Sequence, residues 1–199
     1  METEIKYLVN REMAEIEKEV KDIYENLRYI QELYLPAIYY DTRSGNIANN
    51  KAALRVRKES GQWIGCYKAT TGEERRFIEE EVELSEQDLD SEDWISSLQH
   101  YSDLIKIASE EEIEPKLKID TRRKVYELTY KNMLLEIVFD WVDYLEGLKQ
   151  EERVEVELKK GDYKDFNIFV QNFEEEIKGL KETQISKYQR ARELLNTSA

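Results

Sequence analysis

Polar and apolar residues alternate in short stretches along much of this chain, and a period of two is typical of β-strands. The first stretch contains Glu2, Glu4 and Lys6 at alternate positions, so these three side chains share one face of the predicted strand. Later stretches repeat the alternation or have the β-branched and aromatic content of strands. The predicted strands are residues 2–9, 36–42, 52–58, 62–68, 74–84, 113–130, 133–144 and 153–159.

Other stretches follow the period of about 3.6 residues that predicts helices. The apolar face of residues 10–32 consists of Met13, Ile16, Val20, Ile23, Leu27 and Ile30. Further helices are predicted over residues 85–109, 162–180 and 184–196. Strands and helices do not follow the βαβ order of a parallel sheet. The pattern therefore predicts one α+β domain, residues 1–199, built on about eight mostly antiparallel strands.

The polar faces of these strands carry charge on strand after strand. The charged positions are Glu2, Glu4 and Lys6; Arg55 and Arg57; Lys68; Glu79 and Glu81; Arg122 or Arg123; Glu136 and Asp140; and Glu155 and Glu157. If helices cover the apolar face of the sheet, these charges lie inside a closed barrel, where burial without partners is prohibitive. Such a lumen must hold a highly charged ligand, and a polyanion with divalent cations suits both signs. The alternative is a flat antiparallel sheet with a salt-bridged face in solvent.

Composition limits the class of ligand. The net charge of -14 argues against a general nucleic-acid or anionic-membrane surface, although 30 lysines and arginines leave room for a local basic pocket. Cys66 and His100 are the only residues of their kinds, so an internal disulfide is impossible and a structural zinc site lacks ligands. No apolar run approaches the roughly 20 residues of a membrane span, and no signal peptide is recognised, so we expect a cytoplasmic protein.

Taken in order, several segments resemble those of the CYTH family, also known as triphosphate tunnel metalloenzymes. The matching segments are Glu2-x-Glu4-x-Lys6, Tyr40-Asp41-Thr42, Leu54-Arg55-Val56-Arg57, Tyr67-Lys68, Arg123-Lys-Val-Tyr126, Leu135-Glu-Ile-Val-Phe-Asp140, Val154-Glu155-Val-Glu157-Leu-Lys159 with Gly161, and Ser186-Lys187-Tyr188. Each block is short, but together they span nearly the whole chain. The resemblance implies a closed tunnel of eight antiparallel strands with helices packed outside and a C-terminal helix.

The resemblance also implies roles for individual residues. Glu2, Glu4 and Glu157 would hold Mg²⁺ or Mn²⁺, with Glu79 or Glu81 as a further carboxylate of the metal site. Glu155 and Asp140 would complete the metal shell or orient water during catalysis. The phosphate oxygens would be bound by Lys6, Arg55, Arg57, Lys68, Arg123 and Lys187. Phosphoryl transfer needs little beyond such positioning and charge neutralisation, so the chemistry does not require a histidine.

Two segments leave alternatives open. In residues 74–84, either Arg75 or Arg76 could match the arginine of the family. In residues 113–130, four basic residues compete for inward positions, and alternation cannot place all of them inside; they are Lys116, Lys118, Arg122 and Arg123.

The family includes inorganic, thiamine and RNA triphosphatases and class IV adenylyl cyclases. We expect hydrolysis of inorganic triphosphate, because no pocket for an organic group can be identified and the negative charge argues against RNA. The alternatives are a cyclase, a thiamine or nucleoside triphosphatase, or a non-catalytic module that binds a phosphorylated ligand. The expected partner is a small triphosphate, without nucleic acid or membrane; the sequence does not give the oligomeric state. We also expect residues 184–196 to move and to close Lys187 over the ligand, with a static cap as the alternative.

Overall fold

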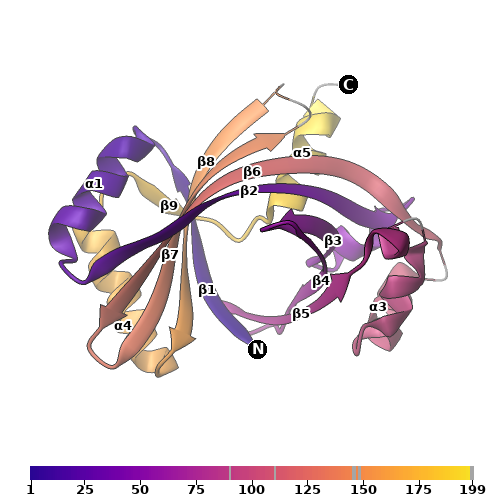
Figure 1. Ribbon diagram of the computed structural model, residues 1–199, viewed down its shortest axis with the longest axis horizontal. Coiled ribbons are helices and arrows are strands. Elements are labelled where there is room, and N and C mark those ends of the chain that lie inside the picture. Colours follow the sequence, from indigo (N-terminus) through magenta and orange to yellow (C-terminus); the bar gives the residue numbers. More distant parts are fainter. Residues whose placement is uncertain (90, 110, 145–146, 148, 198–199) are drawn as a thin grey trace.

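Strands form the body of the molecule in the computed structural model, which describes residues 1–89, 91–109, 111–144, 147 and 149–197. The strands are β1 (Glu2–Val9), β2 (Leu27–Thr42), β3 (Ala52–Glu59), β4 (Gln62–Thr70), β5 (Arg76–Leu84), β6 (Ile113–Tyr130), β7 (Met133–Tyr144), β8 (Lys149–Lys160) and β9 (Leu180–Glu182). Among the described residues, the first eight form a closed antiparallel barrel and β9 is added to the edge of β1 (Figure 1). The predicted α+β class and antiparallel barrel are confirmed.

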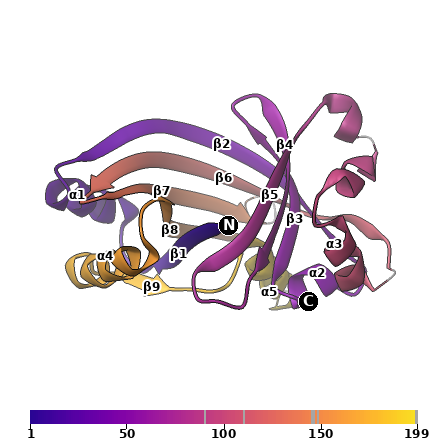
Figure 2. The ribbon, with the colours of Figure 1, turned by 90° about the horizontal axis from the view of Figure 1, so that it is seen from below.

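The helices lie around this barrel. They are α1 (Met13–Ile23), α2 (Asn46–Asn49), α3 (Tyr101–Ala108), α4 (Tyr163–Glu176) and α5 (Lys187–Thr197), with the 3₁₀ helices η1 (Glu86–Leu89) and η2 (Glu92–Ser97). Figure 2 shows α1 and α4 at one side of the molecule and α2 and α3 at the other. Among the described residues, no helix is long and apolar enough to span a membrane.

The barrel closes where β1 meets β5. The strand order is β5-β4-β3-β2-β6-β7-β8-β1, and the last strand pairs with the first. This closing pairing is short, because only Glu2 with Phe77 and Thr3 with Arg76 lie in register in the described chain. One further backbone hydrogen bond runs from Glu4 N to Arg75 O, at 3.0 Å. By contrast, β2 and β6 pair along their whole lengths.

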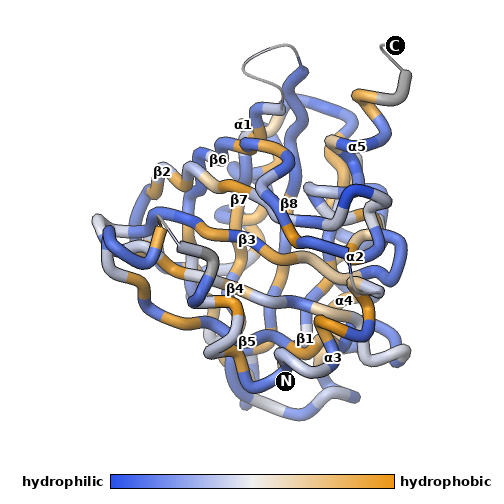
Figure 3. Tube along the Cα trace, turned by 90° about the vertical axis from the view of Figure 1, so that its right-hand side faces the viewer, coloured by the Kyte–Doolittle hydropathy of each residue, from blue (hydrophilic) through white to orange (hydrophobic). Residues whose placement is uncertain are grey.

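Helices cover the outer, apolar face of the barrel in two places. The first core packs α1 and α4 on the outer faces of β1, β6, β7 and β8; Ile16, Phe169 and Val156 are among its buried residues. The second packs η2 and α3 on β3 and β4, with Trp94 and Leu54 buried. Figure 3 shows hydrophobic and hydrophilic residues alternating along these strands. Because the apolar faces are buried outside, the charged faces of the same strands point into the barrel.

A third core fills one end of the barrel interior. Tyr39, Ile119 and Tyr144 from the strands pack there against Tyr188 and Ala191 of α5. The rings of Tyr39 and Tyr188 stack with centroids 5.3 Å apart and an angle of 2°. The C-terminal helix is therefore part of a buried core that closes this end.

The predicted helix over residues 10–32 is wrong in its second half. The helix α1 ends at Ile23, and Leu27 begins β2. Ile23 and Ile30 are 41% and 43% exposed, so the apolar face that the period suggested is not buried there. From Leu27 onward the chain pairs with the 18-residue strand β6, and this tertiary pairing overrides the local helical period.

Two further expectations need correction. Residues 85–109 form two 3₁₀ helices and the short helix α3, not one continuous helix. The predicted helix over residues 162–180 stops at Glu176, and β9 follows at Leu180–Glu182. A strand of three residues is too short for its period to be recognised.

Candidate functional site

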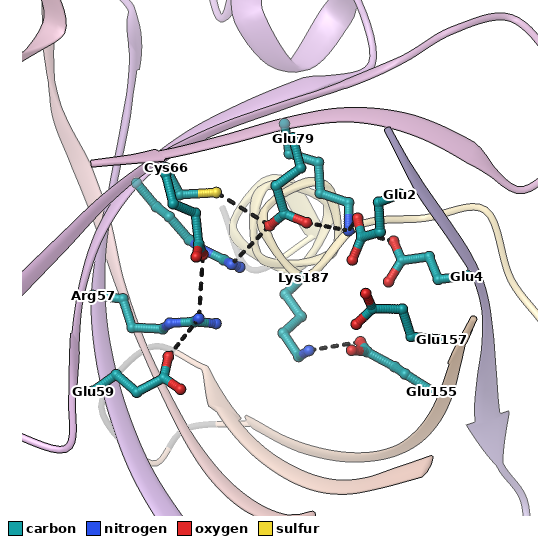
Figure 4. A network of polar contacts seen from close by, with 12 residues as sticks. Glu2, Glu4, Arg57, Glu59, Cys66, Glu79, Glu155, Glu157 and Lys187 are labelled. Carbon is teal, nitrogen blue, oxygen red and sulfur yellow. Dashed lines mark hydrogen bonds and ion pairs between the residues drawn. The ribbon is translucent and has the colours of Figure 1, made fainter. Parts of the chain in front are cut away.

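A cavity of about 790 Å³ occupies the barrel interior. Its charged lining residues come from β1, β3, β4, β5, β6, β7, β8 and the start of α5; they are Glu2, Glu4, Lys6, Arg55, Arg57, Glu59, Lys68, Glu79, Glu81, Arg123, Glu136, Glu155, Glu157, Lys159 and Lys187. Figure 4 shows many of these side chains pointing toward one another. The period of two places them there, because neighbouring residues on each strand belong to the outer cores.

Three carboxylates lie in one row across neighbouring strands. Glu157 on β8 is in register with Glu4 on β1 and with Glu136 on β7. Like charges in register are destabilising, and burial together with Glu136 and Glu4 raises the pKa of Glu157, although Lys159 opposes the shift. This row offers the hard oxygen ligands that Mg²⁺ and Mn²⁺ prefer, and a bound cation would relieve the repulsion.

Glu2 extends the acidic row toward the barrel seam. Burial and the neighbouring Glu4 raise the pKa of Glu2 to about 9, although Lys68 lowers it. Burial acts in the same direction on Glu4, but Lys6 and Lys68, each 2.5 Å from Glu4 Oε1, hold its pKa below the usual value. Glu2 also pairs with Lys68. The carboxylates of β1 therefore fit a cation site that has two lysines directly beside it.

Arginines dominate another part of the wall. Arg57 lies 2.6 Å from Glu59 and 3.5 Å from Glu81, and Arg55 lies 3.7 Å from Glu79. Burial lowers the pKa of Arg57, and the positive charges of Arg55 and Arg123 lower it further against the effect of the two glutamates. A guanidinium whose pKa is lowered by other cations lies in a site with too little negative charge, which is the environment that an anionic ligand completes.

The cations meet at a small side cavity. Arg55, Arg57, Arg123 and Lys187 all line this space of about 20 Å³, together with the uncharged Thr121. The Nε atoms of Arg55 and Arg57 are buried and have no hydrogen-bond partner among the described residues. Unsatisfied buried donors are costly, and an anion bound in this cavity would satisfy these two.

Four side chains form a closed ring of ion pairs next to these arginines, and the two carboxylates of the ring, Asp140 and Glu155, are buried. Arg123 makes two bonds of 2.7 Å to Asp140 and one of 2.7 Å to Glu155. Lys187 lies 2.8 Å from Asp140 and 2.7 Å from Glu155. Burial opposes the charge of Glu155, but Lys187 and Arg123 outweigh it and hold its pKa well below the usual range. The ring joins β6, β7, β8 and α5 at the floor of the cavity.

Hydrogen bonds at the start of α5 determine that the helix begins at Lys187. Gln189 N donates to Ser186 Oγ and Ser186 N donates to Gln189 Oε1, both at 3.1 Å. This reciprocal pair is a capping box, which starts the helix at Lys187. Ser186 and Lys187 both line the main cavity, so the first turn of α5 faces its interior.

Comparison with known proteins shows to which family this chain belongs. The model of the CYTH domain matches residues 1–191. This chain belongs to the CYTH family. A search of the curated proteins found no significant match.

Solved structures share the CYTH fold over nearly the whole chain. HpAC1 from Hippeastrum, an adenylyl cyclase candidate described as having a dominant triphosphatase activity, has a TM-score of 0.71 at 17% identity and covers 97% of this chain and 96% of its own. A candidate adenylate cyclase from Bacillus halodurans has a TM-score of 0.68 at 17% identity, with 96% of each chain covered. A protein from Pyrococcus horikoshii has a TM-score of 0.64 at 23% identity, with 100% of each covered. At these identities the likeness concerns the fold.

The positions that the CYTH resemblance left open can now be located. Glu79 and Glu81 both line the cavity. Arg75 instead bonds Asn167 and Glu182, and Arg76 lies over the ring of Tyr163, so neither arginine is among the described lining residues. Of the four basic residues of β6 that competed for inward positions, Arg123 alone is part of the described lining. Arg122 lies over Trp141 on the outer face.

Most of the predicted site residues line the CYTH cavity, but Asp140 lies beneath it. Asp140 is fully buried and is not among the described lining residues; it reaches the site through Arg123 and Lys187. Glu136 was predicted to face the lumen but was given no role in the site, and Lys159 was not assigned to the site although its alternation with apolar neighbours could have identified it. Cys66 and Tyr39 line the cavity as well, and no sequence signal distinguishes them from core residues.

Proposed function

We propose that this CYTH protein is a divalent-metal-dependent triphosphatase and that its substrate is inorganic triphosphate. The observation that carries the proposal is the division of one cavity into a carboxylate row and a group of arginines and lysines with unsatisfied donors. A metal-bound polyphosphate has both charges, so it complements both parts of this wall.

Arg55, Arg57 and Lys187 bind phosphate oxygens at the cationic part of the cavity. Arginine suits this role because its planar guanidinium donates two bonds to one phosphate, while lysine acts as a point charge. A bound phosphate also removes the repulsion that lowers the pKa of Arg57. Lys6 and Lys68, beside the carboxylates, are within reach of phosphate groups that share the metal.

Glu2, Glu4 and Glu157 hold the divalent cation, with Glu136 as a fourth carboxylate of the row. A cation bound there would neutralise negative charge on the phosphate oxygens and would lower the pKa of a water molecule bound to it. Glu155 belongs to the ring of ion pairs and lies on β8 two residues before Glu157, where it would orient water or complete the cation site. Asp140 fixes Arg123 and Lys187, because both of its oxygens are engaged by them.

The lining of the cavity supports inorganic triphosphate rather than an organic triphosphate. The one aromatic residue among the described lining residues is Tyr39, whose ring is already stacked on Tyr188. A nucleobase or thiamine ring held by stacking would need a free aromatic platform. The described activity of HpAC1 is consistent with a triphosphatase. A cyclase is the second candidate, because two of the similar structures are described as candidate adenylyl cyclases.

Phosphate release from tripolyphosphate, ATP and thiamine triphosphate, with Mg²⁺ and with Mn²⁺, tests the proposal. We expect release from tripolyphosphate that stops when a chelator is in excess. Full activity in the chelator would contradict the metal site, and cyclic AMP formed from ATP would favour the cyclase. Binding of tripolyphosphate without any turnover would indicate a binding module.

A matched pair of variants tests the cationic wall. Arg57→Ala should weaken tripolyphosphate binding by on the order of tenfold or more, since a charge-assisted bond is lost. Arg11→Ala also removes a paired arginine, but Arg11 binds Glu19 on α1, so binding should be unchanged. Calorimetry measures both affinities, and equal losses would contradict the assignment of Arg57.

A further inference from the structure

Arg153 is a buried cation that the proposed binding and metal sites do not use. Its side chain is 0% exposed and it is absent from the described lining of the main cavity. It lies on β8 two residues before Glu155, on the same face of the strand. Burying a guanidinium is costly unless its donors are bonded, so its partners indicate why it is there.

These partners connect β8 to the segment that leads into α5. Arg153 Nε donates to Glu151 Oε1 at 2.8 Å, and Nη1 donates to the carbonyl oxygen of Ile185 at 2.9 Å. Glu151 also accepts from Arg190 Nε at 3.0 Å and from the hydroxyl of Tyr144 at 3.2 Å. We name Arg153, Glu151 and Arg190, with the carbonyl of Ile185, the Arg153 clamp.

The clamp holds the chain on both sides of Lys187. Ile185 comes two residues before Lys187 and Arg190 three residues after it, so the first turn of α5 is tied to β8 at two points. Lysine has a long, flexible side chain, and it acts at a defined position only if its backbone is fixed. The capping box sets where the helix begins, whereas the clamp sets where that beginning lies relative to the barrel.

We propose that Arg153 is a positioning residue, which holds the start of α5 so that Lys187 reaches the bound phosphate. That Lys187 binds phosphate rests on the proposed function. The clamp itself is a contact between described residues, so its effect on α5 can be measured without any substrate.

The first arm of the test is a double-mutant cycle on tripolyphosphate affinity, measured by calorimetry in the intact protein. Arg153→Met and Lys187→Met should each weaken binding by on the order of tenfold. If Arg153 acts through Lys187, adding Arg153→Met to Lys187→Met causes no further loss. Independent losses that multiply, or no loss in Arg153→Met, would overturn the proposal. Phe166→Leu is the control for lowered stability, because Phe166 belongs to α4 and is buried in the core outside the barrel, and the affinity of this variant should be unchanged.

The second arm is hydrogen exchange without ligand. Arg153→Met should speed exchange in residues 187–197 and leave residues 13–23 of α1 unchanged; equal exchange in α5 of the variant and the parent would overturn the proposal. If the parent protein does not bind tripolyphosphate, the proposed function fails, and this arm still tests the clamp. If Arg153→Met does not fold, Glu151→Gln replaces it in both arms, because it removes the charge that joins Arg153 to Arg190.

Discussion

Phe77 is an aromatic residue among charged ones, at the seam between β5 and β1. Its ring centroid is 4.5 Å from Lys6 Nζ and 5.0 Å from Lys68 Nζ. Both lysines are bonded to Glu4. A metal bound to Glu4 would compete with both lysines for that carboxylate. The face of the Phe77 ring would then still attract the two ammonium groups.

Phe77→Leu should therefore weaken tripolyphosphate binding by roughly three- to tenfold, the size of a partly buried cation–π contact. Phe77→Tyr keeps the ring face and should bind as the parent does. Calorimetry in the presence of Mg²⁺ measures both, and a melting temperature for each variant separates binding from stability. Unchanged affinity in Phe77→Leu would show that the ring only fills the seam.

Cys66 lies in the cavity wall as a neutral thiol. It is 2% exposed and donates to Glu79 at 3.4 Å. Burial, with Glu79 and Glu81, raises the pKa of Cys66 to about 12, although Arg55 lowers it. The thiolate fraction thus stays small until the pH approaches that value, and only the thiolate reacts rapidly with disulfide reagents.

We expect Cys66 in the folded protein to react at pH 8 at least about a hundredfold more slowly than in denaturant, where its pKa returns to roughly 8.5. The absorbance of the thiol that Cys66 releases from a disulfide reagent measures the reaction rate in the folded protein and in denaturant. Comparable rates would mean that the thiol is accessible and ionised.

Residue roles were predictable where charge alternates with apolar residues and not elsewhere. In β8, Glu155 and Glu157 alternate with Val154 and Val156, so the sequence specified their face. Phe77 and Cys66 share the inner face, but no sequence pattern distinguishes an uncharged residue at such a position from a core residue. Arg153 has the same alternation as Glu155, yet its partner Ile185 is distant in sequence and contributes a backbone carbonyl, which no side-chain pattern predicts.

At the scale of elements, α5 is fixed in the structure by its packing. Tyr188 is 2% exposed, stacks on Tyr39 and belongs to the core that closes one end of the barrel. These contacts favour the static cap over the mobile segment that the sequence suggested, because mobile elements have few buried contacts.

Tyr188→Ala should destabilise the protein by about 3 kcal/mol or more, since it leaves a cavity in this core. Leu195→Ala is the control in the same helix; Leu195 is 42% exposed, and the change should cost less than about 0.5 kcal/mol. Urea unfolding measures both. If Tyr188→Ala lowers the free energy of unfolding no more than Leu195→Ala does, the alternative of a mobile C-terminal segment would be favoured again.

The elements that the sequence mispredicted are those whose identity depends on distant partners. The eight barrel strands were predicted because each has its own period or composition. At Leu27, where β2 begins, the sequence predicts helix, because Leu27 and Ile30 fit the helical period of α1 and the pairing with β6 is not visible locally. The strand β9 exists because it pairs with Tyr7, Leu8 and Val9 of β1.

At the scale of the whole molecule, the seam between β1 and β5 is the shortest junction of the barrel. Two residue pairs lie in register there, compared with twelve between β6 and β7. The proposed ligand lies across this seam, because Glu4 and Lys6 belong to β1 while Lys68 and Arg55 belong to β4 and β3. A metal-bound triphosphate would hold together the two sides that the backbone joins weakly.

In the free protein, the amides of Glu4 and Phe77 should therefore exchange with solvent at least about a hundredfold faster than the amides that bond β6 to β7, because short pairings open at low free energy. Saturating tripolyphosphate with Mg²⁺ should slow exchange at the seam and leave the β6–β7 junction nearly unchanged. Hydrogen exchange followed by mass spectrometry of short peptides measures both regions. Equal slowing everywhere would indicate general stabilisation by ligand binding, and no slowing at the seam would show that the ligand does not bridge β1 to β3 and β4.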